Sequence, residues 1–224
     1  MRNRVVGPLL ALVGACAIGV PPGGDELDAR IDAPIDAPSL QTITLTQTSN
    51  ANVEPQASVA CTETATGVTR ENSYYRVFRL ADFGVTRPFT PSMVSFGVEL
   101  ATAGGGGAGQ TVQVKLHTLN GPLQVASLVT VATNSALVPN SGISMVDVPI
   151  APQPRLDPTA TLVAEVFVPD AMPVGHILFV GANMGSETAP GYIRAPTCSL
   201  LEPTTYAGVG FPAVRLLLTV TGTY

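Results

Sequence analysis

Short runs of alternating apolar and polar residues fill the chain from Thr42 to its end. This period of two is typical of half-buried β-strands, because successive side chains of a strand point to opposite faces. Clusters of Pro, Gly and Asn separate the runs at fairly regular spacing, as in β-sandwiches and barrels. We therefore predict strands over residues 42–46, 93–100, 111–118, 123–132, 144–150, 159–168, 176–181 and 213–221.

Two of these runs show their predicted faces most clearly. In the run 111–118, Lys115 and His117 fall on the polar face, which is predicted to point outward. The apolar residues of this run and of the run 93–100 are predicted to point into the core. They are Val94, Phe96, Val98, Leu100, Val112, Val114 and Leu116.

The run from Asn72 to Gly84 is predicted to hold the central strand of the fold. Bulky side chains fall on both of its faces, which suits a strand that is covered on both sides. These side chains are Tyr74, Tyr75, Val77, Phe78 and Leu80. The sequence therefore predicts an all-β domain over residues 41–224, an antiparallel β-sandwich of jelly-roll-like type.

The first sixteen residues have the layout of an export signal. Arg2 and Arg4 form a basic start, a short apolar stretch follows, and Val13-Gly-Ala-Cys16 ends the segment. This order resembles the lipobox of bacterial lipoprotein signals, in which small residues precede a cysteine. The resemblance implies that residues 1–15 are a signal peptide and that Cys16 carries a lipid anchor. A cleaved secretory signal with an incidental cysteine is the alternative.

Residues 16–40 hold this cysteine and a segment that we expect to be a disordered tether. A four-residue unit recurs at Asp28–Ile31, Asp32–Ile35 and Asp36–Ser39. Proline at this spacing disfavours helix and sheet, and the aspartates repel one another. The segment resembles spacers of surface lipoproteins in some soil-dwelling Gram-negative bacteria. Together with Ala17, where an Asp would accompany inner-membrane retention, it implies an outer-membrane lipoprotein facing the periplasm or the cell exterior.

Composition narrows the range of partners. The net charge is −5 and no cluster of Lys and Arg occurs, which argues against nucleic acid, because phosphates need a basic patch. No apolar run reaches the roughly 18 residues of a membrane-spanning helix. We therefore expect contact with a membrane through the lipid anchor, and a glycan or a protein as ligand.

Cys61 and Cys198 remain once Cys16 is lipidated. In an oxidising exterior the two are expected to form a disulfide. Two free thiols are the alternative. A metal site is less favoured, because neither cysteine has a second Cys or a His close by in sequence.

The glycine-rich stretch 104–111 fits two phosphate-binding patterns without their structural context. Both patterns need a helix directly after the loop, whereas here a predicted strand follows at Val112. The stretch is therefore predicted to be a flexible hairpin loop.

His117 and His176 are the two residues that could act as an imidazole base, and no Gly-x-Ser-x-Gly motif accompanies them. We expect no catalytic residue and no cofactor.

Four scattered carboxylates could form a glycosidase pair or a calcium site if the fold brought them together. They are Glu99, Asp147, Glu165 and Asp170. Linear sequence does not show such convergence. We expect them to face solvent on strands and turns, and we predict no metal site.

The polar stretch 183–194 is the predicted ligand-contact surface. Tyr192 could stack on a sugar, and Arg194 could donate a fork of hydrogen bonds. A structural loop with a half-buried Tyr192 is the alternative, and the absence of Trp weakens the case for a sugar platform.

Four short motifs together resemble the β-sandwich accessory domains of secreted bacterial proteins. These are Asn72–Phe78, Phe96–Glu99, Val166–Asp170 and Tyr192–Cys198. That group has no catalytic motif that can be transferred to this chain. The resemblance implies a non-catalytic lipoprotein with a binding or envelope-structural domain. The alternatives are a secreted hydrolase acting on polysaccharide, and an outer-membrane β-barrel protein, whose last strand the alternation up to Tyr224 resembles.

Overall fold

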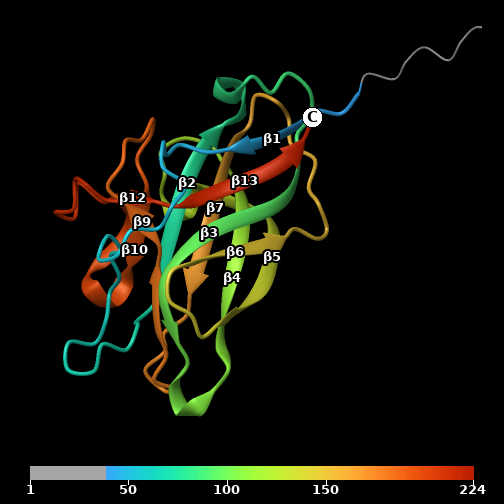
Figure 1. Ribbon diagram of the computed structural model, residues 1–224. Helices are drawn as coiled ribbons and strands as arrows, with labels where there is room; N and C mark the ends of the chain where they lie inside the picture. Colours follow the sequence, from blue (N-terminus) through green and yellow to red (C-terminus); the bar gives the residue numbers. More distant parts are fainter. Residues whose placement is uncertain (1–38) are drawn as a thin grey trace, which may run out of the picture. The chain divides into compact units, whose positions relative to one another are not determined.

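A computed structural model describes residues 39–224 of the protein (Figure 1). The predicted signal peptide of residues 1–15, the lipidated Cys16 and the predicted tether through residue 38 lie outside the described residues. Residues Leu40–Tyr224 form one compact unit. Within the described part, no helix has the length and apolar character that crossing a membrane requires.

The described residues form thirteen strands, which confirms the predicted all-β class. Four single-turn 3-10 helices, η1 to η4, lie between them. The strands are β1 (Thr42–Leu45), β2 (Asn72–Arg79), β3 (Thr90–Thr102), β4 (Gly109–Leu119), β5 (Leu128–Pro139), β6 (Ser144–Pro149), β7 (Thr161–Val168), β8 (Ile177–Val180), β9 (Ala182–Asn183), β10 (Tyr192–Ala195), β11 (Leu200–Thr205), β12 (Arg215–Leu216) and β13 (Leu218–Thr223).

Two antiparallel sheets pack face to face as a sandwich (Figure 1). The five-stranded sheet has the order β1-β13-β3-β6, with β8 paired to β3, and the six-stranded sheet has the order β11-β10-β2-β7-β4-β5. A small ribbon of β9 and β12 accompanies them. The chain changes sheet at most connections, which makes the sandwich jelly-roll-like, as predicted.

Strand β2 lies inside the six-stranded sheet, where the central strand was predicted. Tyr74 and Phe78 point into the core and are fully buried. Phe96 of β3 is also fully buried and belongs to the same core cluster. The strand ends at Arg79, where η1 (Leu80–Phe83) begins. Gly84 closes this turn with a left-handed φ of 72°, which glycine adopts without strain. The predicted run therefore holds a strand and a turn.

Leu100 departs from the predicted faces of β3. The other predicted inward residues of this strand are fully buried, but Leu100 is 38% exposed. The pairing of β3 with β8 shifts register between Val98 and Leu100, which places a bulge at Glu99. A bulge adds one residue and so turns the following side chains to the other face. The Glu99 carboxylate holds the bulge by accepting hydrogen bonds from the backbone N–H groups of Gln56 (2.6 Å) and Ser58 (3.0 Å).

Three backbone segments meet at Gly97 of β3. The other two are at Leu217, between β12 and β13, and at Gly181, between β8 and β9. Gly97 N donates to Leu217 O (3.0 Å), and Gly181 N donates to Gly97 O (2.7 Å). A Cβ atom at Gly97 would lie 2.7 Å from Val53 Cγ2 and 3.2 Å from Gly181 Cα. Glycine is favoured here because a side chain would crowd these segments.

Strand positions differ from the prediction in two places. The strand predicted over 123–132 begins instead at Leu128, after η3 (Val125–Ser127), and runs on to Pro139. Strands β10 and β11 lie where no strand was predicted, and β10 begins inside the stretch 183–194 that was expected to be a polar surface loop. Pro203 does not prevent β11, because this strand lies at the edge of its sheet.

The glycine-rich stretch was predicted to be a hairpin loop, and this is wrong. It joins β3 to β4, which belong to different sheets, so it is a crossover connection. It contains η2 (Gly104–Gly106) and leads into β4 at Gly109. A strand follows it, as predicted, and not the helix that a phosphate-binding loop needs.

The predicted disulfide between Cys61 and Cys198 is present, with a Cα–Cα distance of 6.0 Å. It joins the segment before β2 to η4 (Pro196–Cys198), the turn between β10 and β11. The two cysteines are 137 residues apart in sequence. In the chain-entropy view, closing so long a loop stabilises the fold by at most about 5 kcal/mol.

Candidate functional site

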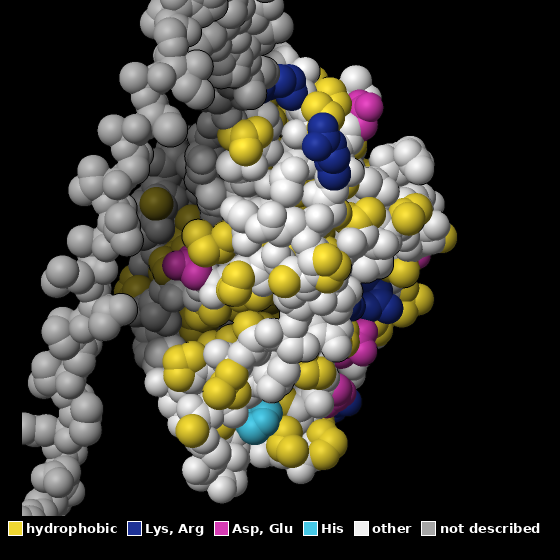
Figure 2. Space-filling model, turned by 90° about the vertical axis from the view of Figure 1, so that its right-hand side faces the viewer, with side chains coloured by type: hydrophobic (Ala, Val, Ile, Leu, Met, Phe, Trp, Pro, Cys, Tyr) yellow, Lys and Arg dark blue, Asp and Glu magenta, His cyan; other side chains and the backbone are white. Residues whose placement is uncertain are grey.

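Charged side chains make up only 12% of the chain, and they are scattered on the face that Figure 2 shows. On the outer face of the six-stranded sheet, which points away from the five-stranded sheet, polar side chains are instead grouped together. Its strand register places Tyr75 of β2 opposite Glu165 of β7, and Glu165 opposite Lys115 of β4. Two residues along, Ser73 lies opposite Phe167. Polar and aromatic side chains of three neighbouring strands therefore converge on one patch.

These side chains line a groove of about 390 Å³, which we call the outer-face groove. Its walls come from five of the six strands and from the connection that precedes β5. The lining residues are Ser73, Tyr75, Gln113, Lys115, His117, Val125, Leu128, Thr130, Thr133, Glu165, Phe167 and Arg194.

A hydrogen-bonded chain of three side chains lies at the base of the groove. His117 Nε2 is 2.9 Å from Glu165 Oε2, and His117 Nδ1 is 3.0 Å from Thr130 Oγ1. His117 and Glu165 are each 4% exposed, whereas Thr130 is exposed. The prediction that Glu165 faces solvent is wrong, because the residue lies in mid-sheet under the side chains of both neighbouring strands. His117 connects this buried carboxylate to a hydroxyl at the surface.

The environment of Glu165 keeps its carboxylate ionised. Burial alone would raise the pKa of Glu165, but the hydrogen bond from His117 and the charge of Lys115 outweigh burial and lower it. Burial, and then the Glu165 charge, raise the pKa of Tyr75. The floor of the groove therefore holds a fixed negative charge beside a neutral phenol.

The Lys115 ammonium lies in the groove without a hydrogen bond to the Glu165 carboxylate. Lys115 Nζ lies 3.6 Å from Glu165 Oε1 and 4.2 Å from the centre of the Phe167 ring. The ion-pair distance is too long for a hydrogen bond, so the ammonium N–H groups stay available. Ser73 is 1% exposed, and its hydroxyl lies close enough to Glu165 and Tyr75 to lower the pKa of both. It therefore belongs to the floor of the groove.

The outer-face groove is bridged from one edge of the sheet to the other. Val125 lies in η3, which leads into β5 at one edge, and Glu202 lies in β11 at the other edge. Val125 N donates a hydrogen bond of 2.8 Å to Glu202 Oε2. Because the two edge elements meet, the outer face beneath them forms a hollow and not a flat surface.

Arg194, a predicted ligand-contact residue, lies in this groove. Its Nη1 donates to Glu71 Oε1 (2.9 Å) and its Nε donates to Leu201 O (3.0 Å). Tyr192 is half-buried and faces an adjoining hollow that Val77 also lines. Both residues belong to β10 and share its outer face, and their contact with a ligand stays a prediction.

The segment that precedes these two residues is held by a buried charge. Arg76 is 0% exposed, and its Nη1 lies 2.9 Å from Glu187 Oε2. Its Nη2 donates to Leu216 O (2.7 Å). Burial lowers the pKa of Arg76, and Glu187 opposes that shift. Residues 183–191 are therefore anchored to the core and do not form a free loop.

The remaining candidates lie apart from the groove. His176 Nδ1 accepts a hydrogen bond of 2.8 Å from Gly104 N. Asp170 forms an ion pair of 3.0 Å with Arg70, and Asp147 is exposed on β6. The four carboxylates do not meet in one site. Residues 39–224 hold no group of three or more His, Cys, Asp or Glu side chains that could bind a metal ion.

Reasoning from the sequence missed Ser73, Lys115 and Phe167 as residues that line the groove. A usable signal was present, because β2, β4 and β7 each carry polar or aromatic residues two positions apart on one face. The sequence does not show that these strands are neighbours, and only the pairing order β2-β7-β4 brings their residues into one groove.

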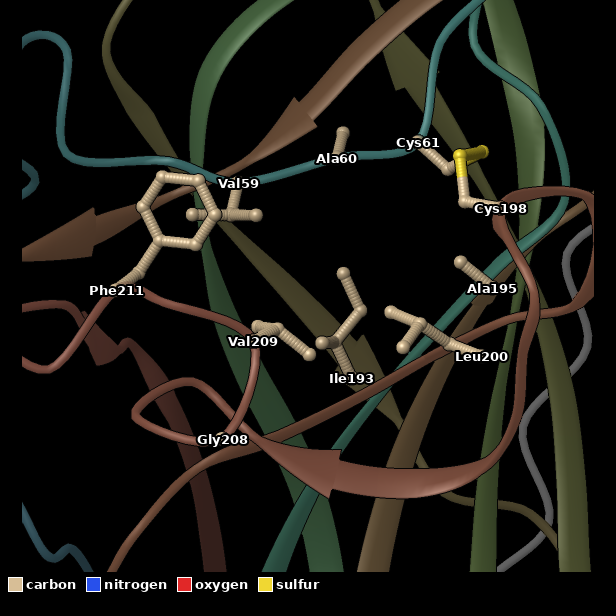
Figure 3. Close-up of a pocket in the computed structure, with 10 residues that line it drawn as sticks. All are labelled: Val59, Ala60, Cys61, Ile193, Ala195, Cys198, Leu200, Gly208, Val209 and Phe211. Atoms are coloured by element: carbon tan, nitrogen blue, oxygen red, sulfur yellow. A yellow bond between two sulfur atoms is a disulfide. The ribbon is translucent and has the colours of Figure 1, made fainter.

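A second hollow, which we call the hairpin cavity, lies against β10 and β11 (Figure 3). It has a volume of about 370 Å³ and a mostly apolar lining. Figure 3 shows Ile193, Leu200 and Val209 pointing into it, with Phe211 at one end and the disulfide at the other. Its lining residues are Val59, Ala60, Cys61, Ile193, Ala195, Cys198, Leu200, Gly208, Val209 and Phe211.

Comparison with known proteins leaves the chain without a family. No family model matches the chain, and no curated protein matches it. A solved structure with some likeness holds the cysteine protease and lectin-like domains of Cwp84, a surface layer associated protein of Clostridium difficile. The two share 11% identity over 69% of this chain, with a TM-score of 0.45. The chain covers 32% of that structure's length, and a likeness this low assigns neither family nor function.

Proposed function

We propose that this protein is a non-catalytic, lipid-anchored protein of the outer membrane whose outer-face groove binds a neutral glycan. The anchor is the lipid on Cys16, and the display faces the periplasm or the cell exterior. The binding domain is the sandwich of residues 41–224. The observation that carries the proposal is the groove itself, with a buried, ionised Glu165 held by His117 at its base.

The buried His117–Glu165 pair favours a binding role, because the fold does not require it at this position. Packed apolar residues at such buried sites stabilise a protein as well as polar pairs do. Perturbed ionisable groups in a groove are typical of functional sites. The Lys115 ammonium and the exposed Thr130 hydroxyl provide donors and an acceptor at fixed positions, which is what sugar hydroxyls require.

The charge balance of the groove favours a neutral ligand. Lys115 is paired with Glu165, and Arg194 is paired with Glu71. No net charge is left to attract an ionic group. Phe167 is not a stacking platform, because the Lys115 ammonium already lies over its ring. Recognition would therefore rest on hydrogen bonds to the Lys115 ammonium and to the exposed Thr130 hydroxyl.

A hydrolase is the second candidate, and the Thr130–His117–Glu165 chain favours it. A hydroxyl, an imidazole and a carboxylate in hydrogen-bond order are the parts of a catalytic triad. A glycosidase of the two-carboxylate type does not fit, because Glu165 is the one carboxylate among the groove's lining residues. The candidate activity is ester or amide cleavage with the exposed Thr130 hydroxyl as nucleophile.

The test is calorimetric titration of residues 41–224 with neutral oligosaccharides and, in parallel, with uronic-acid oligomers. Lys115→Ala and Arg194→Ala should each weaken neutral-glycan binding by about 1 kcal/mol or more. Asp147→Ala, on the other sheet, is the control and should bind normally. Binding of the acidic oligomers alone, or equal affinity in all variants, would contradict the proposal. Turnover of ester, peptide or glycoside substrates that disappears in His117→Ala would establish the hydrolase instead.

A further inference from the structure

We propose that the hairpin cavity is a second ligand site, which takes an uncharged small molecule with a two-ring aromatic or branched aliphatic group. The cavity is separate from the outer-face groove although both use β10. Arg194 points into the groove, whereas its neighbours Ile193 and Ala195 point into the cavity. One short strand therefore separates a polar site from an apolar one.

The size of the cavity sets the size of the ligand. An engineered apolar cavity of about 150 Å³ holds one benzene ring. The hairpin cavity, at about 370 Å³, has room for two rings or for a branched chain of similar bulk. It also lies within the range of small-molecule pockets, roughly 300–1,000 Å³.

The lining excludes a charged group from the cavity. None of its ten lining residues carries a titratable side chain once Cys61 and Cys198 are joined. Ile193 and Ala195 at its floor are 1% and 0% exposed. An ion placed against such walls would lose its hydration without gaining a partner. The part of the ligand that enters must therefore be hydrocarbon.

The walls are held apart, so the hollow is ready for a ligand. The disulfide fixes the η4 turn against the segment that carries Val59. On the opposite side, Phe211 N and Val209 N donate to Tyr206 O at 2.8 and 3.2 Å. A rim fixed in this way does not need to reorganise on binding, which favours affinity.

A small molecule fits this cavity better than a second copy of the chain. A protein interface needs a broad apolar patch. Of the lining residues, Phe211 is 47% exposed, and the sequence neighbours of Cys198, Thr197 and Ser199, are exposed polar residues. The apolar surface is thus a bounded hollow with a polar margin.

The absence of Trp from the chain allows a site-specific test. Phe211→Trp places a single indole at the cavity rim, and Leu137→Trp places one on exposed β5 as the matched control. Titration of each full-length variant with the uncharged fluorophore N-phenyl-1-naphthylamine should quench the indole at 211 in a saturable, one-to-one manner. The indole at 137 should change little.

Filling the cavity should abolish this response. Val59→Phe in the Phe211→Trp background should weaken probe binding at least tenfold at an unchanged melting temperature. If Val59→Phe lowers the melting temperature, Leu200→Phe fills the cavity from another wall. Equal quenching at 211 and 137, absence of binding, or full affinity in both filled variants would overturn the proposal. A dimer seen by sedimentation and lost in Val59→Phe would assign the cavity to a second copy and overturn it too.

Discussion

His117 Nε2 and Glu165 Oε2 lie 2.9 Å apart on the neighbouring strands β4 and β7, beneath the groove on the outer face of the six-stranded sheet. Both residues are almost fully buried, although they are on the side of the sheet that faces away from the core. The bridge between Val125 and Glu202 explains how that face excludes solvent. The pair therefore depends on the sheet, on the bridge and on the neighbouring Lys115.

The first prediction concerns the pH dependence of stability. The pKa of Glu165 is lowered from its ordinary value of 4.5 in the folded protein. The carboxylate therefore stabilises the fold above that value, and this contribution is lost as the pH falls through the lowered one. Glu165→Gln removes the contribution, so its melting temperature should lie furthest below that of the wild type at about pH 7, and the difference should shrink as the pH falls below 4.5.

Differential scanning calorimetry across this pH range checks the prediction. The titratable groups that face Glu165 are His117, Lys115 and Tyr75, beside the hydroxyl of Ser73, and all four side chains stay in place in the variant. Asp147→Asn is the control, since Asp147 is exposed on the other sheet. A melting-temperature difference that stays constant with pH would show that Glu165 is not the linked group.

A second prediction concerns the junction of β3, β8 and β13. Gly97→Ala would bring a Cβ atom within 2.7 Å of Val53 Cγ2 and 3.2 Å of Gly181 Cα. Overpacking of this kind should lower the free energy of unfolding by about 1–3 kcal/mol, as urea denaturation would measure. Gly142→Ala is the matched control, because its new methyl group meets nothing within 4 Å. If the two variants were equally stable, the junction would be looser than the structure indicates.

A third prediction concerns the disulfide. Reduction, or the double change Cys61→Ser and Cys198→Ser, frees a loop of 137 residues. The lost stabilisation is at most about 5 kcal/mol, and each kcal/mol corresponds to about 2–4 °C for a domain of this size. The melting temperature should therefore fall by several degrees or more. An unreduced sample treated with iodoacetamide is the control, and an equal melting temperature in both states would rule out a stabilising role.

Much of the fold could be predicted from the sequence, because the alternation of apolar and polar residues within a strand is a local feature. In β4, Val112, Val114 and Leu116 are fully buried as predicted, because alternation alone decides which face of a strand is apolar. Where the register shifts, the same rule fails, as at Leu100 after the bulge. Strands β10 and β11 escaped prediction because they are short and because a proline stands inside β11.

The groove could not be predicted in the same way, because it arises from pairing between distant strands. His117 and Glu165 are 48 residues apart in sequence, and no spacing rule connects them. Their meeting depends on β7 lying between β2 and β4. Arg194 was singled out for its guanidinium, and the fold places it at the edge of the same groove.

A fourth prediction concerns the anchor. If Cys16 carries lipid, Cys16→Ser should release the protein from the membrane fraction or leave its signal peptide uncleaved. Mass spectrometry of the mature N-terminus supplies the direct measurement, and the wild-type protein prepared in parallel is the control. An N-terminus that begins at an unmodified residue other than Cys16 would exclude the lipoprotein.

The last prediction concerns the bridge over the outer-face groove. Glu202 Oε2 accepts a hydrogen bond of 2.8 Å from Val125 N, and Glu202 itself is exposed. Glu202→Ala should therefore leave the melting temperature nearly unchanged, because an exposed side chain contributes little to stability. It should also release η3 from β11 and open the groove, so that the affinity for a neutral glycan falls.

Glu202→Gln provides the matched control, because its amide oxygen can still accept the hydrogen bond from Val125. Calorimetric titration should place its affinity close to that of the wild type and well above that of Glu202→Ala. Hydrogen exchange at the Val125 amide should be faster in Glu202→Ala than in Glu202→Gln. Equal exchange and equal affinity in the two variants would mean that the groove keeps its shape without the bridge. Weakened binding in both would point to the charge of Glu202 as the group that the ligand contacts.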